Sequence, residues 1–544
     1  MFATVTVAYT VLGILISVVI TSYVRIFYGA QRRVNQPLKN ALSTGQNQKM
    51  KKYSQAPGPR PWPIIGNLHL LDRYRDTPFA GFTELAKQFG DIYSLTFGHT
   101  RCLVVNNLEL IREVLNQNGK VMSGRPDFLR YHKLFGGERS NSLALCDWSQ
   151  LQQKRRNLAR RHCSPRESSS FYVKMSEIGC AEMEHWNREL REQLVAGEPM
   201  EIKSLILKAC ANMFSQYMCS LRFDYQDKEF EQIVQYFDEI FWEINQGHPL
   251  DFLPWLSPFY QRHLNKITNW STTIRKFILD RIISHRELNV DVDEPDRDFT
   301  DALLKSIVED KEVSRNTIIF MLEDFVGGHS AVGNLVMLVL AYIARDQDIG
   351  KRIQEEIDGL TSPEKPQISL MDMNEMPYTM ATIFEVLRYS SSPIVPHVTT
   401  EDAVISGYGV TKGTLVFINN YVLNTSEKNW VNPQEFNPQR FLEKSHRRNS
   451  HKGSGSDSGF ESDTEKLQLR KNIPHFLPFS IGKRTCIGQN LVRGFGFLIL
   501  ANILQRYDVS SHDSSTIQIS PESLALPAKC FPLVLRPREK MDSK

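Results

Sequence analysis

The segment with the clearest chemical potential is Phe479-Ser-Ile-Gly482-Lys-Arg484-Thr-Cys486-Ile-Gly488, which places one cysteine between two glycines. Glycines permit tight turns and close backbone approach, so this loop can aim its N–H groups at the Cys486 sulfur. A mostly apolar helix is predicted directly after the loop, and the positive end of its dipole favours a thiolate. A haem iron can use such an anion as its axial ligand.

The F-x-x-G-x-R-x-C-x-G pattern resembles the haem-ligand signature of the cytochrome P450 family, and the resemblance extends from about Pro57 to Pro537. It implies the cytochrome P450 fold with one haem b, iron protoporphyrin IX, whose iron is bound by Cys486. It also implies that Arg484 pairs with a haem propionate and that Phe479 packs beside the proximal face and limits access of water. The alternative is an inert buried cysteine, which the other motifs disfavour.

Two further motifs supply a glutamate and a pair of arginines. Glu385 and Arg388 are three residues apart, which places them on one face of a predicted helix, and Arg440 follows downstream. The resemblance implies that these three residues form the structural ionic triad of the family, because a buried carboxylate must be paired and hydrogen-bonded. The alternative for Glu385 and Arg388 is an exposed pair on a helix surface.

Other residues are candidates for contacts with the haem propionates. His397 ends the run Pro-Ile-Val-Pro-His, which resembles the P450 segment that lines the pocket and then reaches the haem. Family members often have W-x-x-x-R, but here Trp148 is followed four residues later by Gln152. Arg155 would share a helix face with Trp148 and take that role, or Arg156 would do so. The alternatives are a satisfied histidine at a strand start and a solvated basic face.

A long apolar run from Ser314 to Arg345 predicts one helix of roughly 48 Å that crosses the domain. Gly327 and Gly328 in its middle would cost roughly 2 kcal/mol relative to alanine, so we expect a packing reason for them. Haem with dioxygen over that helix face would provide one.

The residues after these glycines depart from the family pattern. Most P450 enzymes have an acid and a threonine there, which help to deliver protons during oxygen activation. Here the sequence reads His329, Ser330 and Ala331, so the usual relay is missing. We expect His329 or Ser330 with an ordered water, or the substrate's own hydroxyl, to replace it. The alternative for His329 is a plain pocket residue.

The composition supports a globular, mainly helical chain. Its 544 residues include 41% apolar residues and carry a formal net charge of +4, so there is no reason to expect a nucleic-acid partner. The eight cysteines form no C-x-x-C pair, which disfavours a zinc site or a disulfide framework. Helical spacing dominates, and pieces such as Ile92–Phe97 and Thr414–Ile418 predict strands. The predicted fold class is therefore mainly α with a minor β part.

Residues 1–28 predict a transmembrane signal anchor. The first 24 residues carry no charged side chain, and about 20 apolar residues span a bilayer. Seven basic residues and no acid follow between Arg25 and Lys52, so the positive-inside rule places the remainder in the cytosol. The alternative is a buried core helix at the N-terminus.

The rest of the chain divides into a linker and one large domain. Residues 29–56 predict a basic flexible linker, and residues 57–540 the P450 haem-thiolate catalytic domain. Within that domain, residues 444–465 are polar and serine-rich, which predicts a disordered, solvated insert. Phosphorylation of its serines is the alternative reading. The apolar stretch Leu250–Leu256 is predicted to dip into the bilayer.

Within the family, the Gly-Gly-His-Ser-Ala run and the divergent Trp148 region look closest to insect enzymes that act early in ecdysteroid hormone synthesis from sterols. This resemblance implies a monooxygenase or oxidase that acts on a sterol precursor at the endoplasmic reticulum membrane. The alternatives are a P450-type isomerase or lyase that needs no external electrons, and a haem-based sensor or ligand-binding protein. No flavin or nicotinamide domain is recognised. The resemblance therefore implies electrons from NADPH through a separate membrane reductase. Lys483 and Arg155–Arg161 are the expected docking face, and the alternative is that these charges are merely solvated.

Overall fold

The computed structural model describes residues 13–14, 17–21, 53–195, 197–309, 313–391, 394–444, 467–519 and 522–538. Helices dominate these ranges, and short strands form four small sheets. The prediction of a mainly α fold with a minor β part is confirmed. The predicted anchor 1–28, linker 29–56 and insert 444–465 lie almost wholly outside the described residues.

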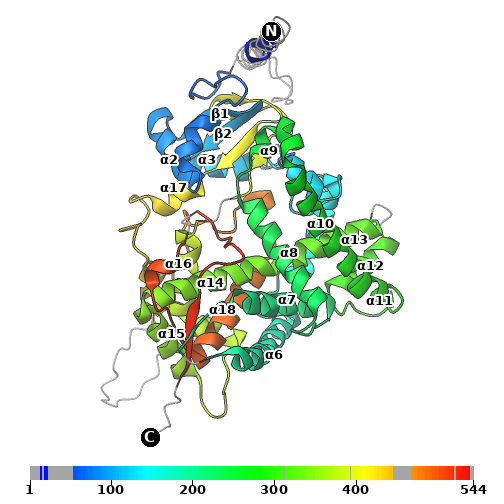
Figure 1. Cartoon of the computed structure of the whole chain (residues 1–544), viewed down its shortest axis with the longest axis vertical. Coiled ribbons are helices and arrows are strands. Elements are labelled where there is room, and N and C mark those ends of the chain that lie inside the picture. Colours follow the sequence, from blue (N-terminus) through cyan, green and yellow to red (C-terminus); the bar gives the residue numbers. More distant parts are fainter. Residues whose placement is uncertain are drawn as a thin grey trace, which may run out of the picture.

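The largest sheet has the strand order β1-β2-β7-β4 and lies with α2 (Pro78–Phe89) and α3 (Leu108–Arg112) at one end of the molecule (Figure 1). β1 (Ile92–Phe97) and β2 (Thr100–Val105) form a hairpin, and β2 runs parallel to β7 (Leu415–Ile418). β7 is central in the sheet and buried along its whole length, as its apolar run predicts. β4 (His397–Val398) pairs antiparallel with β7, which fixes the position of His397.

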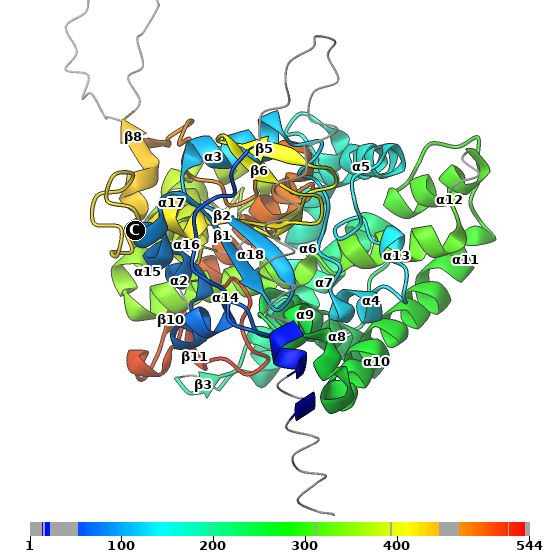
Figure 2. The ribbon, with the colours of Figure 1, turned by 90° about the horizontal axis from the view of Figure 1, so that it is seen from above.

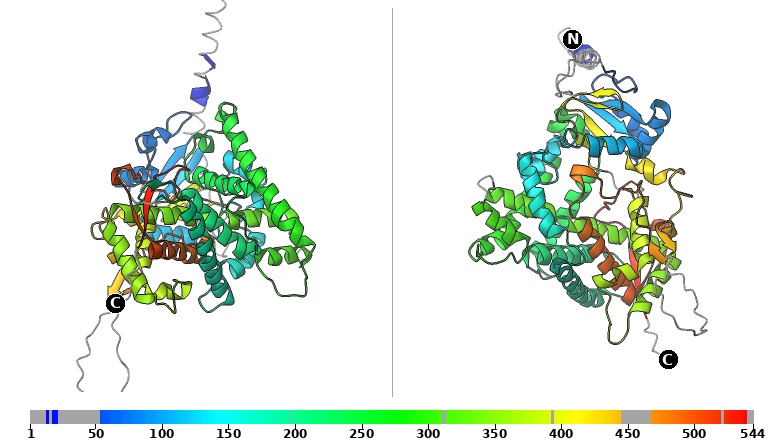
Figure 3. Two further views of the ribbon diagram at one scale, coloured as in Figure 1. Left: turned by 60° about the horizontal axis from the view of Figure 1, so that its bottom comes forward. Right: turned by 180° about the vertical axis from the view of Figure 1, so that it is seen from behind.

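The main helical core consists of α6 (Ser170–Gln193), α7 (Lys203–Cys219), α14 (His329–Arg345) and α18 (Gln489–Arg506). α14 packs against α7 and α18, and α6 packs against the same two helices. Figures 1 and 3 show this core on one side of the four-stranded sheet β1-β2-β7-β4. Because α18 is apolar on almost all sides and buried, it anchors the end of the loop that precedes it.

The remaining elements surround this core (Figure 2). The other helices are α4 (Leu129–Leu134), α5 (Gln150–Cys163), α8 (Lys228–Asn245), α9 (Pro249–Phe252), α10 (Gln261–Phe277), α11 (Ser284–Glu287), α12 (Phe299–Glu309), α13 (Arg315–Val326), α15 (Gln347–Leu360), α16 (Pro377–Tyr389) and α17 (Asn420–Thr425). The other strands are β3 (Pro199–Met200), β5 (Ala403–Ile405), β6 (Tyr408–Val410), β8 (Leu442–Lys444), β9 (Leu467–Leu469), β10 (Tyr507–Ser510) and β11 (Leu533–Pro537).

The predicted single helix from Ser314 to Arg345 is two helices, α13 and α14, joined at Gly327 and Gly328. The junction is a tightened turn, in which Gly328 N donates to Phe325 O at 3.0 Å and Ala331 N donates to Gly328 O at 3.2 Å. In the described part of the chain, the run Arg315–Arg345 alone is long and apolar enough to cross a membrane. Because 83% of its most apolar window is buried in the protein, we assign it to the core.

The structure supplies a packing reason for the two glycines, as expected. A Cβ at Gly327 would lie 2.9 Å from the ring of Phe237 in α8, and a Cβ at Gly328 would lie 3.2 Å from the ring of Phe214 in α7. Two phenylalanines therefore give the glycines a packing reason, and haem with dioxygen over the same helix stays a prediction.

The start of α5 also differs from prediction. Ser149 caps the helix, since its hydroxyl accepts a hydrogen bond from Gln152 N at 3.0 Å, and the helix begins at Gln150. Trp148 thus precedes the helix. The prediction that Trp148 and Arg155 share a helix face is wrong.

Candidate active site

The cysteine loop is folded tightly against the sheet end of the protein. Gly482 has a φ of +76°, and a Cβ there would clash with the carbonyl oxygen of Leu115, so only glycine fits. Cys486 N donates to Phe479 O at 3.0 Å, which closes the loop. Cys486 therefore sits three residues before the first residue of α18, as the sequence predicts.

The Cys486 side chain faces an interior space. Cys486 is exposed by surface area, yet burial by the surrounding protein raises the pKa of its thiol. A side chain can have accessible surface and still be surrounded by protein only when it borders an enclosed cavity, so the Cys486 sulfur faces such a cavity. The Gly488 N–H and the charge of Arg156 oppose that rise in pKa and so favour the thiolate. Among the described residues no cluster of three His, Cys, Asp or Glu side chains could hold a metal ion.

Two arginines flank this loop. Arg484 donates from Nε and Nη2 to Ser123 O at 3.0 and 2.8 Å, and from Nη2 to Cys146 O as well, while its buried Nη1 has no partner. Arg156 donates from Nη2 to Thr485 O at 2.6 Å, next to Cys486, and its buried Nε also lacks a partner. Each guanidinium thus keeps a donor for another group.

A third arginine, Arg125, completes what we call the arginine cluster (Arg125, Arg156 and Arg484). Its guanidinium donates to Ala144 O at 3.1 Å and to Val395 O at 3.1 Å. Burial and the charge of Arg484 lower the pKa of Arg125 to about 9, and burial lowers the pKa of Arg156 to about 10. In the ranges that the structure describes, no residue forms an ion pair with any of the three.

His397 lies beside the arginine cluster. Its Nδ1 is 2.6 Å from Met122 O and carries the proton of that hydrogen bond, and its buried Nε2 has no partner. Burial and the charges of Arg125 and Arg484 lower the pKa of His397 well below its ordinary value. Nearby carboxylates would raise that pKa and let Nε2–H donate.

These residues fit haem b. Buried cations without counter-ions are costly, and anions beside them would offset that cost. The two propionates of haem b are such anions, and the unpartnered Nη1 of Arg484 and Nε2 of His397 are donors suited to them. The interior space at Cys486 leaves room for the iron, and it lies beside the arginine cluster.

Trp148 and Arg155 occupy different surroundings. The half-buried Trp148 ring lies 4.9 Å from Lys483 Nζ and 5.9 Å from Arg484 Cζ, so it packs against the cysteine loop. Arg155 donates to Ser140 O at 2.7 Å and to Thr317 Oγ1 at 3.3 Å. Of the two neighbouring arginines, Arg156 is therefore the one beside Cys486.

The structure brings the predicted ionic triad together. Arg388 donates from Nε and Nη2 to the two carboxylate oxygens of Glu385, at 2.7 and 2.8 Å, and Arg440 Nε donates to Glu385 Oε1 at 3.0 Å. Glu385 and Arg388 are fully buried. Arg388 and Arg440 also donate to carbonyls between residues 424 and 435, so the triad ties that segment to α16.

One stripe of the α13–α14 run opens on interior space. From Thr317 to Ala344 every residue is buried except Asp324, Gly327, Gly328 and Ala331, whose spacing places them on one side. Leu335, one turn after Ala331, lies against α18 at Gly496. We call these four residues the cavity stripe. This side of the run therefore continues toward α18, the helix that follows the cysteine loop. The last member of the stripe, Ala331, has no hydroxyl.

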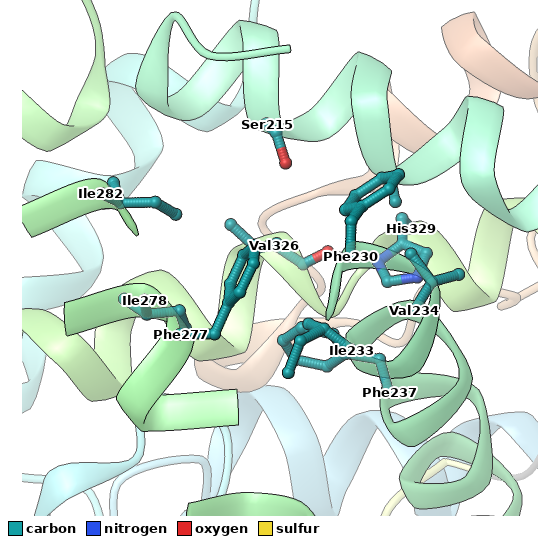
Figure 4. Close-up of a pocket in the computed structure, with 11 residues that line it drawn as sticks. Ser215, Phe230, Ile233, Val234, Phe237, Phe277, Ile278, Ile282, Val326 and His329 are labelled. Atoms are coloured by element: carbon teal, nitrogen blue, oxygen red, sulfur yellow. Dashed lines mark hydrogen bonds between the residues drawn. The ribbon is translucent and has the colours of Figure 1, made fainter. Parts of the chain in front are cut away.

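His329 and Ser330 lie off the cavity stripe and are fully buried. His329 Nδ1 is 2.7 Å from Val326 O, and the ring meets Phe237 edge-on with centroids 5.4 Å apart. It lines an apolar cavity of about 10 Å³ between α7, α8 and α13, room for about one water (Figure 4). Burial lowers the pKa of His329 to about 4, so the ring is neutral at pH 7. A role for either residue in proton delivery stays a prediction.

Sequence reasoning missed Arg125 and Asp324. Arg125 sits in a turn whose neighbour Gly124 exchanges backbone hydrogen bonds with Val398, a contact that nothing local reveals. Asp324 had a usable signal, because it is an acid seven residues before Ala331 and therefore on the same helix side.

An enclosed cysteine beside buried cations that need anions fits a haem-thiolate protein. The chain belongs to the cytochrome P450 family, whose profile, described as "Cytochrome P450", matches residues 56–534. It is a P450 monooxygenase that uses haem b and electrons from NADPH through a reductase.

Cytochrome P450 307a1 of Drosophila melanogaster is 80% identical to this chain over 534 residues, which are 98% of each chain. Cytochrome P450 1A5 of Gallus gallus is 28% identical over 87% of each chain. Cytochrome P450 1B1 of Mus musculus is 27% identical over 90% of this chain and 89% of its own.

Proposed function

We propose that this chain is a membrane-anchored monooxygenase or oxidase that acts on a sterol precursor in ecdysteroid biosynthesis. The enclosed Cys486 beside the arginine cluster carries the enzymatic part of the proposal. The substrate class is supported by the motif resemblance to the insect P450 called spook and its near relatives, and by the 80% identity to an insect P450. The endoplasmic reticulum location follows the signal-anchor pattern of residues 1–28.

The side chains around Cys486 have distinct proposed roles. Haem b supplies the oxygen chemistry when bound, and Cys486 holds its iron. Arg484, Arg156 and His397 bind and orient the propionates, with Trp148 packed behind Arg484. Phe479 covers the proximal side and limits water.

The reductase is proposed to dock on the exposed basic residues near the cysteine loop. Lys483, Arg160 and Arg161 are exposed, whereas Arg155 and Arg156 are buried. The exposed three are therefore the part of the predicted docking surface that a partner can reach.

The decisive experiment is the reduced, carbon monoxide-bound absorption spectrum of the wild type and of Cys486→Ala. It is followed by NADPH-driven turnover of a dehydrogenated sterol with reductase present. We expect a thiolate-type spectrum that the variant loses, together with an oxidised sterol. A folded wild type without the thiolate-type spectrum would contradict the role of Cys486.

A second candidate function, an isomerase or lyase that needs no external electrons, is favoured by Ala331 alone. The cavity stripe presents a methyl group where the proton-relay threonine of the family usually stands. Turnover of a peroxide substrate without reductase, combined with no reductase-dependent product, would select this function over the first.

A further inference from the structure

Asp324 is an acid on the cavity stripe whose carboxylate is only partly used. Its Oδ2 accepts from Leu143 N at 2.6 Å and from the Ser142 hydroxyl at 3.3 Å. Its Oδ1 has one long contact, 3.4 Å from the same hydroxyl, and the Ala144 N–H nearby also favours the charged carboxylate. Among the described residues no cation pairs with it. The Oδ1 atom therefore keeps acceptor capacity for a further partner.

The neighbouring acid, Glu323, is differently placed and gives a matched control. Glu323 lies off the stripe, is buried, and faces Arg275 Nη1 at 3.4 Å. Burial raises the pKa of both carboxyls, to about 8 for Glu323 and about 6 for Asp324. Near neutral pH a larger fraction of Asp324 than of Glu323 is therefore ionised. Of the two acids, Asp324 is the one on the cavity stripe.

The position of Asp324 indicates what it can contact. Seven residues of helix place it roughly 10 Å from Ala331 along the axis. That separation is too long for direct proton transfer to a group beside Ala331. It is within the length of a fused-ring substrate whose far end carries a polar group.

We propose that Asp324 is the polar anchor of the substrate cavity and accepts a hydrogen bond from a hydroxyl of an otherwise apolar, fused-ring substrate. This proposal rests on the sterol class given under the proposed function and deepens it. An acceptor in an apolar cavity discriminates strongly, because a ligand that cannot donate leaves the carboxylate oxygen unpaired. The alcohol should therefore bind about 10- to 100-fold more tightly than its deoxy analogue.

The test measures binding rather than turnover. Cholesterol, its 3-O-methyl ether and 5-cholestene are titrated into the haem-loaded full chain, with the ligand-induced shift of the haem absorption band and equilibrium dialysis as readouts. The wild type and Glu323→Gln should prefer the alcohol. Asp324→Ala should bind all three within about threefold of one another. Asp324→Asn keeps an acceptor for Leu143 N–H but presents an N–H₂ donor to the cavity, so it should gain affinity for the ether.

The outcomes distinguish failure of the Asp324 anchor from failure of the sterol substrate class. If Asp324→Ala and Asp324→Asn show the reduced carbon monoxide spectrum of the wild type and keep its preference for the alcohol, the anchor is overturned while the sterol class stands. If the wild type binds none of the three ligands, the sterol class falls and the anchor falls with it. If Glu323→Gln loses the preference as fully as the Asp324 variants, the effect is not specific to the stripe and the anchor is rejected.

Discussion

At the scale of single residues, the arginine cluster gives the haem site its charge. Arg484 contributes a buried donor without a partner, so its loss should weaken haem retention more than the loss of a nearby exposed cation. A hydrogen bond to a charged group is worth about 1.5–3 kcal/mol. We therefore expect Arg484→Ala to lose haem about 10- to 100-fold faster, as measured by transfer to an excess of apomyoglobin.

Lys483→Ala is the control for this experiment, because Lys483 is adjacent in sequence but exposed over the Trp148 ring. Equal rates of haem loss from the two variants would show that any change in this loop weakens haem binding, and that Arg484 is not a specific hydrogen-bond donor to a propionate.

Glu323 makes stability depend on pH. Burial raises its pKa to about 8 in the folded protein, above its ordinary value of 4.5. The folded state therefore holds a proton that the unfolded state releases, and stability is full below about pH 4.5 and falls as pH rises through 8. Glu323→Gln cannot ionise, so its melting temperature should exceed that of the wild type by at least about 2 °C at pH 9. The difference should shrink toward pH 5. Melting curves that keep the same separation at both pH values would contradict the assignment.

At the scale of elements, the junction between α13 and α14 depends on the size of two glycines. Gly327→Ala gains about 1 kcal/mol of helix propensity but overpacks against Phe237, which costs about 1–3 kcal/mol. We expect net destabilisation in urea unfolding. Gly328→Ala, with its softer contact to Phe214, should be near neutral.

The double variant Gly327→Ala/Phe237→Leu tests the cause. The smaller side chain removes the clash, so the double variant should be more stable than the sum of the single changes predicts. Strict additivity would mean that the Phe237 contact does not explain the glycine.

Local patterns predicted what local interactions determine, and the remainder depends on distant partners. The loop around Cys486 and the strand Ile92–Phe97 carry their signals in adjacent residues. The reason for Gly327 lies in Phe237, 90 residues earlier, which no spacing rule reveals. Trp148 lies outside the predicted helix face because Ser149, a strong helix cap, starts the helix one residue after it.

At the scale of the whole molecule, the segment after α9 presents an apolar surface. Trp255 is 53% exposed and Phe259 is 81% exposed. Within the stretch predicted to dip into the bilayer, Phe252 packs instead on Phe97 and Phe128, with ring centroids 5.0 and 5.6 Å apart. The surface that a membrane can reach is therefore centred on Trp255 and Phe259.

Trp255→Ser/Phe259→Ser should weaken the binding of an anchorless chain to phosphatidylcholine liposomes by about tenfold, since each buried aromatic contributes about 1.5–3 kcal/mol and these would be partly inserted. Val431→Ser, at an equally exposed apolar residue elsewhere, is the control and should leave binding unchanged. Cosedimentation measures both, and equal binding by all three proteins would reject this surface.

The β8–β9 hairpin has a consequence for how the sequence can vary. Lys444 and Leu467 are paired across it, so the 22 residues between them enter and leave the domain at one point. Lengthening a closed loop costs only about 0.6 kcal/mol for each doubling. The register of Leu442 with Leu469 and Glu443 with Gln468 is set by the paired strands, whatever the length of chain between them. Relatives can therefore gain or lose tens of residues at this hairpin without a change in the register of β8 and β9. An epitope or a fluorescent reporter can be inserted at the same position.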